Sequence, residues 1–363
     1  MLNYQKESSD SLVPTTHTQT LPIVTVIMPV RNEGDFIARS LMAVIGQDYP
    51  PQLMEVIVAD GMSIDGTREI VSSLQTTYHN LRLVDNPGRI VPTGINAAMD
   101  IAKGQVIVRI DGHCEIAHDY VSRCVEHLQK GEADGVGGPI ETVGQTYLSR
   151  VIACAMSSNF GVGGSAFRTG TQTARLTDTM AFPAYTRAIT ERAGPYDEEL
   201  VRNQDDEYNY RIRKLGGRLI LAPDVKCRYF SRSSLRSLWR QYFQYGYWKV
   251  RVLQKHPLQM RARQFVPLLF IMALLLSAGL SLVSPLAGWA FVAVAGSYIA
   301  ANICASCLTA IRRDLRLMPV LPIAFAAVHF SYGLGNIFGL VRFAGNWRKP
   351  AIKARVRTSD VKG

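Results

Sequence analysis

Short apolar runs alternate with longer amphipathic stretches along the first part of the chain. Four of the runs have the length of a strand, and apolar residues between them recur at helical spacing. Regular alternation of strands and helices predicts right-handed crossovers and an α/β fold with a mostly parallel sheet, whose ligands bind past the carboxyl ends of the strands. The predicted strands are Ile23–Met28, Met54–Ala59, Leu81–Val84 and the run that begins at Val106, and the predicted helices cover residues 36–45, 70–74 and 91–102.

The longest apolar runs all lie after Phe265. Residues 265–283 and 286–310 are each long enough to cross a hydrocarbon layer of about 30 Å. Residues 318–341 form a weaker third candidate. Three crossings would place the seven Lys and Arg residues of the C-terminal tail outside, against the tendency of cations to remain in the cytoplasm. We therefore expect two spans and a third segment that re-enters the membrane or lies in its plane.

The net charge of +11 is concentrated beside these apolar runs. Residues 226–263 hold ten Lys or Arg and no acid, and residues 342–363 hold seven and one acid, so the rest of the chain carries about −5. Basic residues on both flanks of apolar segments indicate contact with an anionic membrane, and the acidic body argues against a nucleic-acid partner. Aromatic residues interleave with the cations of residues 231–263, which predicts an interfacial helix; a solvated basic helix is the alternative.

The composition divides the chain into five parts. Residues 1–20 are polar and lack a secretory signal, so we expect a disordered tail. After this tail we expect a catalytic domain at 21–230, an interfacial segment at 231–263, a membrane region at 264–341 and a basic cytoplasmic tail at 342–363. The six scattered cysteines fit a reducing compartment. Together these features predict a bacterial-type inner-membrane protein with its catalytic domain in the cytoplasm.

The candidate metal ligands stand where the fourth strand ends, in the stretch Val106–Glu115. On an extended chain residues i and i+2 project to the same side, so Asp111 and His113 could hold one ion while Gly112 lets a phosphate approach the backbone. A divalent cation with few protein ligands and open positions is suited to a diphosphate. The alternative is a strand end at which Asp111 caps a turn.

Polar residues also follow the first two strands. The segment Pro29-Val-Arg-Asn-Glu33, which includes Arg31, stands at the end of the first strand, and Asp60 stands at the end of the second. Acidic side chains at these positions can accept hydrogen bonds from a nucleobase and a ribose. Arg89 and Asn96 supply donors before the fourth strand. Asp65 instead fits a helix N-cap.

These residues resemble the motifs of the inverting glycosyltransferases of family 2, which use a nucleotide-binding GT-A fold. Pro29-Val-Arg-Asn-Glu33 is similar to the family's P-x-x-N-E, and Ala59–Thr67 to its D-D-G-S-x-D-G-T, with Ala59 in place of the first acid. Asp111-Gly-His113 is similar to the metal-binding D-x-D, with His113 in place of the second acid. Gln204-Asp-Asp-Glu207 is similar to the E-D-x-D motif, with Gln204 in place of Glu.

The resemblance implies a mechanism and a set of partners. Asp205 would be the general base, and a nucleotide-diphosphate sugar, with UDP-glucose as the expected donor, would lie across Glu33, Asp60 and Asp111. A divalent metal, Mn²⁺ or Mg²⁺, would bind Asp111 and His113, and the imidazole favours Mn²⁺. The residues expected to contact or gate the acceptor are Gln204, Asp206, Gln241 and Tyr245.

Within the family, the motifs resemble glucosyltransferases of succinoglycan-type exopolysaccharide biosynthesis. The predicted reaction is therefore single transfer of a hexose to a lipid-linked saccharide. Gln241-Tyr-Phe-Gln244-Tyr245 lacks the Arg and Trp of the Q-x-x-R-W motif of membrane synthases, which disfavours a processive polysaccharide synthase. A third possibility is a non-catalytic nucleotide-sugar sensor, suggested by Ala59, His113 and Gln204.

Overall fold

The computed structural model describes residues 20–347, in which a mixed eight-stranded sheet forms the centre of the first domain. Its first four strands in space are parallel, as the sequence pattern predicts, and antiparallel pairs join β4 to β9, β9 to β6 and β10 to β8. The predicted α/β fold with a mostly parallel sheet is confirmed. In spatial order the strands are β3 (Leu81–Asp85), β2 (Met54–Asp60), β1 (Val24–Val30), β4 (Val106–Arg109), β9 (Ala184–Thr186), β6 (Gly135–Gly137), β10 (Leu219–Leu221) and β8 (Arg175–Leu176).

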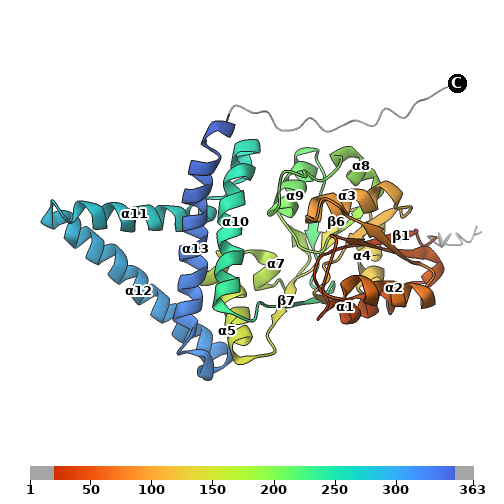
Figure 1. The fold of residues 1–363 in the computed structure, drawn as a ribbon, viewed down its shortest axis with the longest axis horizontal. Coiled ribbons are helices and arrows are strands. Elements are labelled where there is room, and N and C mark those ends of the chain that lie inside the picture. Colours follow the sequence, from red (N-terminus) through yellow and green to blue (C-terminus); the bar gives the residue numbers. More distant parts are fainter. Residues whose placement is uncertain (1–19, 348–363) are drawn as a thin grey trace, which may run out of the picture.

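Helices cover both faces of this sheet (Figure 1). Alternate residues of β1 point to opposite faces, so Val26 and Met28 pack in one apolar core and Ile27 packs in the other. Because both faces of these strands are buried, their sequences are nearly continuous apolar runs. The helices α1 (Ile37–Ile45), α2 (Thr67–Thr77) and α4 (Tyr120–Gln129) cover the first face, and α3 (Val91–Ile101), α8 (Arg187–Ala193) and α9 (Gln204–Lys214) cover the second.

A second sheet of three strands begins directly beyond β4. Strand β5 (Cys114–Ile116) pairs with β11 (Cys227–Phe230), which pairs in parallel with β7 (Ile140–Val143). The chain between β4 and β5 turns at Gly112 and His113. The expectation that Asp111 and His113 share an extended strand is therefore wrong: the strand ends at Arg109, because the chain must turn there to enter the second sheet.

Two long helices pack side by side beyond this domain (Figure 1). Helix α10 (Leu235–Lys255) carries the basic and aromatic segment, and α13 (Leu321–Arg342) lies against it. Glycines at the crossing bring the backbones together: a Cβ on Gly246, Gly335 or Gly339 would overlap a carbonyl oxygen of the opposite helix. Several aromatic residues of α10 thus pack on α13, so protein contact accounts for part of the aromatic pattern that predicted a headgroup layer.

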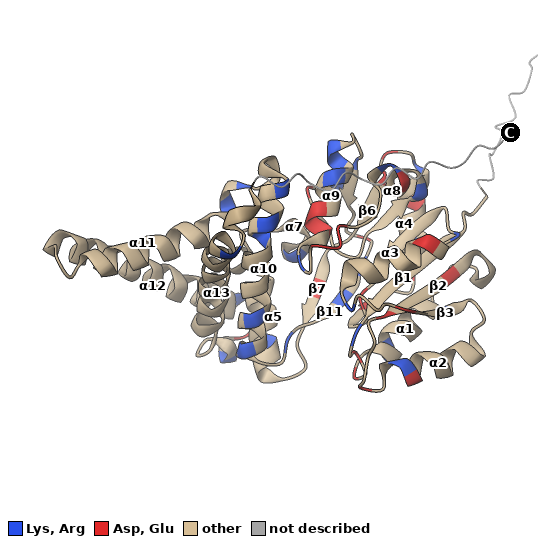
Figure 2. Ribbon diagram, turned by 45° about the horizontal axis from the view of Figure 1, so that its top comes forward, with Lys and Arg blue, Asp and Glu red and all other residues tan. Residues whose placement is uncertain are grey.

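Helices α11 (Val266–Leu280) and α12 (Pro285–Arg313) form a V that projects from the α10–α13 pair (Figure 1). Charged residues are missing from α11 and appear in α12 only at its end, in Arg312 and Arg313 (Figure 2). Apolar side chains near the tip are exposed, with Leu282 at 87% and Leu286 at 78%. The V therefore presents an apolar surface.

The helix lengths change the predicted set of spans. Helices α12 and α13 are long and apolar enough to cross a membrane, whereas α11 has 15 residues and falls short of the roughly 20 that a crossing needs. Residues 265–283 were predicted as a span, but α11 covers only Val266–Leu280 of this run, and the chain then turns before α12 begins at Pro285. Residues 318–341 contain the continuous helix α13, and the expectation that this segment re-enters the membrane or lies in its plane stays a prediction. The tails predicted at 1–20 and 342–363 lie almost wholly outside the described residues.

Candidate active site

A cavity of about 1620 Å³ opens at the carboxyl edge of the sheet and extends to the C-terminal helices. Residues that follow β1 and β4, together with the start of α9, line one part of it. Residues of α10, α11, α12 and α13 line another part. The cavity thus joins the polar strand ends to the apolar helices, as expected for the ligand site of a parallel sheet. Of the predicted site residues, it is lined by Pro29, Arg31, Glu33, Arg89, Asp111, His113, Gln204, Asp205, Asp206, Gln241 and Tyr245.

Arg109 connects the two halves of the polar part. It is the last residue of β4 and is 5% exposed. Its Nη2 lies 2.7 Å from Asp111 Oδ1, and its Nη1 forms an ion pair with Asp205. Burial disfavours the charged guanidinium, but the two carboxylates more than offset this and raise the pKa of Arg109. One arginine therefore holds the candidate metal ligand and the candidate base in the same place.

Asp205 lies in the first turn of α9, where the helix dipole favours a carboxylate. Burial nevertheless raises its pKa above 3.8, and the nearby Asp111 and Asp206 add to the rise while Arg109 opposes it. A carboxyl group with a raised pKa accepts a proton more readily, which suits a general base.

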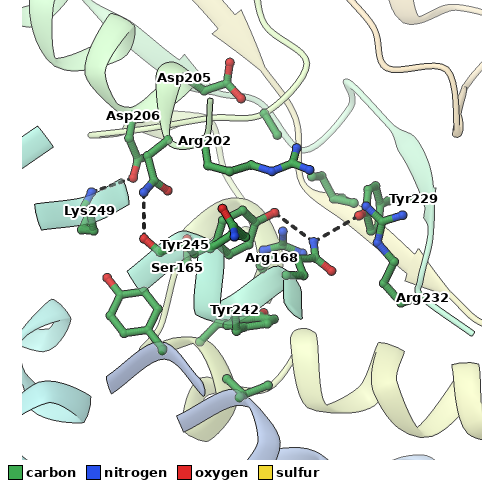
Figure 3. A pocket seen from close by; sticks show the side chains of 18 of the residues that line it. Ser165, Arg168, Arg202, Asp205, Asp206, Tyr229, Arg232, Tyr242, Tyr245 and Lys249 are labelled. Carbon is green, nitrogen blue, oxygen red and sulfur yellow. Dashed lines mark hydrogen bonds and ion pairs between the residues drawn. The ribbon is translucent and has the colours of Figure 1, made fainter. Parts of the chain in front are cut away.

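The neighbouring Asp206 has a different environment. Its Oδ2 accepts a hydrogen bond from Lys249 Nζ at 2.8 Å, and its Oδ1 accepts one from Thr179 Oγ1 at 2.7 Å. Burial opposes ionisation, but Lys249 outweighs it and holds the pKa of Asp206 below the usual value. Because Lys249 is on α10, this pair joins α9 to the C-terminal helices (Figure 3). Both carboxylate oxygens of Asp206 are engaged, so Asp205 is the better candidate base.

His113 pairs with Glu33 at the other side of Asp111. The distance between His113 Nδ1 and Glu33 Oε1 is 2.8 Å, and the ring meets Tyr229 edge-on. A carboxylate on one ring nitrogen is the usual support of a metal-binding histidine, since it orients the ring and leaves Nε2 for the metal. Within residues 20–347 no three His, Cys, Asp or Glu side chains converge as a metal-binding group. Asp111 and His113 therefore fit a divalent ion that takes its remaining ligands from a diphosphate.

The loop after β1 is fixed by the loop after β2. Asn32 adopts a left-handed conformation, with φ of 54°, and its backbone N–H donates to Ser63 Oγ at 2.8 Å. Asp65 accepts hydrogen bonds from the backbone amides of Gly34 and Thr67, so it holds the loop that carries Glu33 to the start of α2. The N-cap of α2 is Gly66, one position after the predicted Asp65. The two sequence motifs therefore form one wall of the cavity.

Two predicted donor-site residues lie outside the lining of the cavity. Asp60 ends β2 and is fully buried; its Oδ2 accepts hydrogen bonds from Arg68 and from the backbone of Ser63. The amide of Asn96 is occupied by Glu198 and by the backbone of Tyr196. The prediction that Asn96 donates to the ligand is corrected, because this side chain fastens α3 to the segment before α9.

The predicted acceptor residues of α10 do meet the cavity. Gln241 Nε2 donates to the hydroxyls of Tyr245 and Tyr229, at 2.9 and 3.4 Å, and its Oε1 has no partner within residues 20–347 (Figure 3). Gln204 is 5% exposed at the start of α9. These side chains surround the space beside Asp205.

Several cations that line the cavity were not identified from the sequence, among them Arg109, Arg168 and Arg232. Arg109 has a signal in the sequence, because it is a charge inside an apolar strand two positions before Asp111. Arg232 belongs to the basic segment that was attributed to lipid, and Arg168 lies in a short helix, α7 (Ala166–Thr169), that follows a glycine-rich loop without a motif.

Comparison with known proteins gives a consistent result. Residues 25–193 match the family model described as Glycosyl transferase family 2. The chain is 30% identical to the succinoglycan biosynthesis protein ExoA of Rhizobium meliloti (strain 1021) over 330 residues, which cover 90% of this chain and 96% of that protein. It is 27% identical, over 64% of this chain and 74% of the relative, to the dolichyl N-acetyl-alpha-D-glucosaminyl phosphate 3-beta-D-2,3-diacetamido-2,3-dideoxy-beta-D-glucuronosyltransferase of Methanococcus voltae.

A solved structure is similar over most of the chain. It is the mannosyltransferase PcManGT from Pyrobaculum calidifontis, in complex with GDP-Man and Mn²⁺, with a TM-score of 0.56 and 22% sequence identity. The similarity covers 88% of each chain. At this identity the likeness shows the fold, which is GT-A.

Proposed function

The chain belongs to glycosyltransferase family 2, and we propose that it transfers a hexose from a nucleotide-diphosphate sugar to a lipid-linked saccharide, with inversion, in exopolysaccharide biosynthesis. The relation to ExoA supports a role in making a succinoglycan-like polysaccharide, with UDP-glucose as the expected donor. The observation that carries the proposal is the position of Asp205 and Asp111 on the two sides of Arg109 within one cavity.

The donor would occupy the polar part of the cavity. Glu33, Arg31, Arg89 and Asp111 all line this part. Arg31 Nη1 donates to the backbone oxygen of Arg89 at 3.3 Å, which holds the two donor-side loops together. Asp60, buried behind the cavity lining, remains a proposed nucleotide-binding residue because its Oδ1 has no hydrogen-bond partner within the described residues.

Asp205 would act on the acceptor. Its carboxylate would take the proton of an acceptor hydroxyl while that oxygen forms a bond to the anomeric carbon and the bond from this carbon to the nucleoside diphosphate breaks. The nucleotide leaves with the electron pair of the broken bond. Attack from the face opposite to the leaving group inverts the configuration, and no glycosyl-enzyme is needed. Arg109 would keep the carboxylate in place and favour its ionised form.

Asp111 and His113 would hold a divalent metal, with Glu33 orienting the imidazole. When bound, such an ion neutralises charge that develops on the leaving diphosphate. The Mn²⁺ named with the mannosyltransferase agrees with a metal in this fold.

The acceptor and the membrane are proposed from the other part of the cavity. Helices α12 and α13 are long and apolar enough for a bilayer, and the relative from Methanococcus voltae is named for a dolichyl-phosphate-linked sugar. A cytoplasmic catalytic domain on a bacterial-type inner membrane, with the basic face of α10 near anionic lipid, is the proposed arrangement.

The test is transfer by the purified full chain from radiolabelled nucleotide sugars to lipid extracts. We expect a labelled lipid-linked saccharide of fixed size with wild type. Asp205→Asn should abolish transfer while leaving donor binding nearly intact, since the base acts on the acceptor. Long polymer would show a processive synthase, and donor binding without turnover by wild type would show a sensor; either result would overturn the proposal.

A further inference from the structure

Arg168 is a cation of the cavity that forms no ion pair within residues 20–347. Its Nη1 is buried and has no hydrogen-bond partner, and none of the carboxylates that the structure describes lies within ion-pair distance of the guanidinium. The guanidinium lies 5.9 Å from the ring centre of Tyr229 and 5.3 Å from that of Phe167. A buried donor without a partner on a charged group is costly, so this guanidinium suits an anion that arrives with a ligand.

Arg232 lies beside Tyr229 in the close-up view (Figure 3). It too lines the cavity and has no ion-pair partner within the described residues. Tyr229, and more weakly Tyr245, Glu33 and Asp111, raise the pKa of Arg232. Its position is therefore between the candidate donor side and Arg168.

Tyrosines of α10 separate Arg168 from the membrane helices. Burial disfavours the charged form of Arg168, but Tyr242 and Tyr245, and more weakly Tyr229 and Asp206, raise its pKa. Beyond them the wall of the same cavity becomes apolar and comes from the C-terminal helices, through Phe270 of α11, Val294 of α12 and Val328 of α13. A ligand that fills the cavity thus meets the candidate base, then free cations, then an apolar wall.

We propose that Arg168 and Arg232 bind the phosphate of the lipid-linked acceptor, and that its polyprenyl chain leaves the cavity along α11, α12 and α13. This inference rests on the proposed function and names the acceptor's anchoring group. Charge-assisted hydrogen bonds from guanidinium groups suit phosphate oxygens, and the apolar wall suits an isoprenoid. The saccharide between the two would extend toward Asp205.

The diphosphate of the donor is the other source of phosphate near these arginines. The neighbours of Arg168 favour the acceptor as the source of the phosphate that it binds. The aromatic side chains around Arg168 come from α7, β11 and α10, whereas the loops after β1 and β2 form the candidate donor side. Titrations with two ligands separate the sources. Farnesyl diphosphate carries a diphosphate on an isoprenoid, whereas UDP carries one on a nucleoside.

The experiment uses the full chain in detergent micelles and isothermal titration calorimetry. Wild type should bind farnesyl diphosphate more tightly than either farnesol or inorganic diphosphate. Arg168→Gln should weaken binding of farnesyl diphosphate by about tenfold or more, with UDP affinity unchanged within about twofold. Arg168→Lys should retain part of the affinity because it keeps the charge. Arg236→Gln is the matched control, since Arg236 is an exposed cation of α10 outside the cavity lining.

Unchanged affinity of Arg168→Gln for farnesyl diphosphate would overturn the proposal. A parallel loss of UDP affinity in this variant, with wild-type thermal stability, would assign Arg168 to the donor and also overturn it. Equal binding of inorganic diphosphate and farnesyl diphosphate by wild type would reject the lipid part. Failure of the proposed function can be distinguished from failure of this inference. If the proposed function is wrong, wild type will bind farnesyl diphosphate but will show no UDP binding or no transfer.

Discussion

The guanidinium of Arg109 is ion-paired with the carboxylate of Asp205, 96 positions later in the chain. Arg109 ends the central strand β4, and Asp205 begins helix α9. The pair therefore links the half of the domain that resembles a nucleotide-binding fold to the half that supplies the candidate base.

Replacing Arg109 by Met should destabilise the protein and abolish transfer. The substitution removes a buried cation and leaves Asp111 and Asp205 as neighbouring carboxylates without compensation. Loss of one partner of a buried ion pair costs about 3 kcal/mol of the free energy of unfolding. Thermal unfolding in detergent measures the effect, and Arg109→Lys should recover part of the stability. A melting temperature equal to that of wild type in Arg109→Met would contradict the structural role.

The pH dependence of activity should report Asp205. The base must be ionised, and burial raises its pKa above 3.8, so kcat/KM should fall as the pH decreases through a midpoint above that value. The pKa of Asp206 is held below its usual value by Lys249, which outweighs burial. An acidic limb with its midpoint below 3.8 would therefore point to Asp206 and away from Asp205.

Chelation should remove activity, and Mn²⁺ should restore it better than Mg²⁺, because an imidazole is a better ligand for Mn²⁺. Glu33→Gln should raise the Mn²⁺ concentration required for half-maximal activity by about tenfold, since Glu33 orients His113. Glu69→Gln, at an exposed carboxylate of α2 outside the cavity lining, is the control and should leave this concentration unchanged. Activity that persists in chelator would count against the metal role of Asp111 and His113.

The sequence predicted the strands of the first half well for a physical reason. Strands buried on both faces, such as β1 and β2, must be apolar throughout, and their polar ends must face the ligand edge. The same local pattern could not show that β4 stops at Arg109, because the turn is set by the pairing of β5 with β11, which lies more than 100 residues later.

Long-range contacts also decide which predicted side chains reach the cavity. Asn96 follows a motif in sequence, but the backbone of Tyr196 binds its amide in the folded protein. Arg168 lies outside the polar strand ends and is brought to the cavity by the folding of α7 beside β7. Periodicity and spacing describe neighbours along the chain, whereas these contacts depend on the tertiary structure.

The attachment of α10 to the catalytic domain should weaken in acid. Glu199 accepts hydrogen bonds from Arg251 and Lys255 of α10, at 2.6 Å from Arg251 Nε and 2.7 Å from Lys255 Nζ. Arg251 first, and Lys255 with it, lower the pKa of Glu199 to about 2 from 4.5, so this contribution to stability is present above pH 4.5 and is lost as the pH falls toward 2.

Glu199→Gln should therefore lower the free energy of unfolding by about 1 to 2 kcal/mol at neutral pH, an amount discounted because the carboxylate is partly exposed. The difference from wild type should shrink as the pH falls below 4.5. Glu191→Gln, at a carboxylate that is 65% exposed, is the control and should have little effect. A difference that stays constant from neutral pH to pH 3 would rule out the titration of Glu199 as its cause.

The crossing of α10 and α13 should not tolerate a side chain at Gly335. A Cβ there would overlap the backbone oxygen of Phe243, and backbone cannot move aside unless the helices separate. Gly335→Leu should lower the free energy of unfolding by about 1 to 3 kcal/mol. It should also reduce transfer, because α10 carries Gln241 and Tyr245 to the cavity.

Gly296 of α12 provides the matched control for this substitution. A Cβ at Gly296 would have nothing within 4 Å, so Gly296→Leu places the same side chain on an apolar helix without overlap. Thermal unfolding and transfer activity in detergent should be close to wild type for Gly296→Leu and lower for Gly335→Leu. Equal stability of the two variants would mean that α10 and α13 are not held in close contact, and the cavity wall that α10 forms would then have to be mobile.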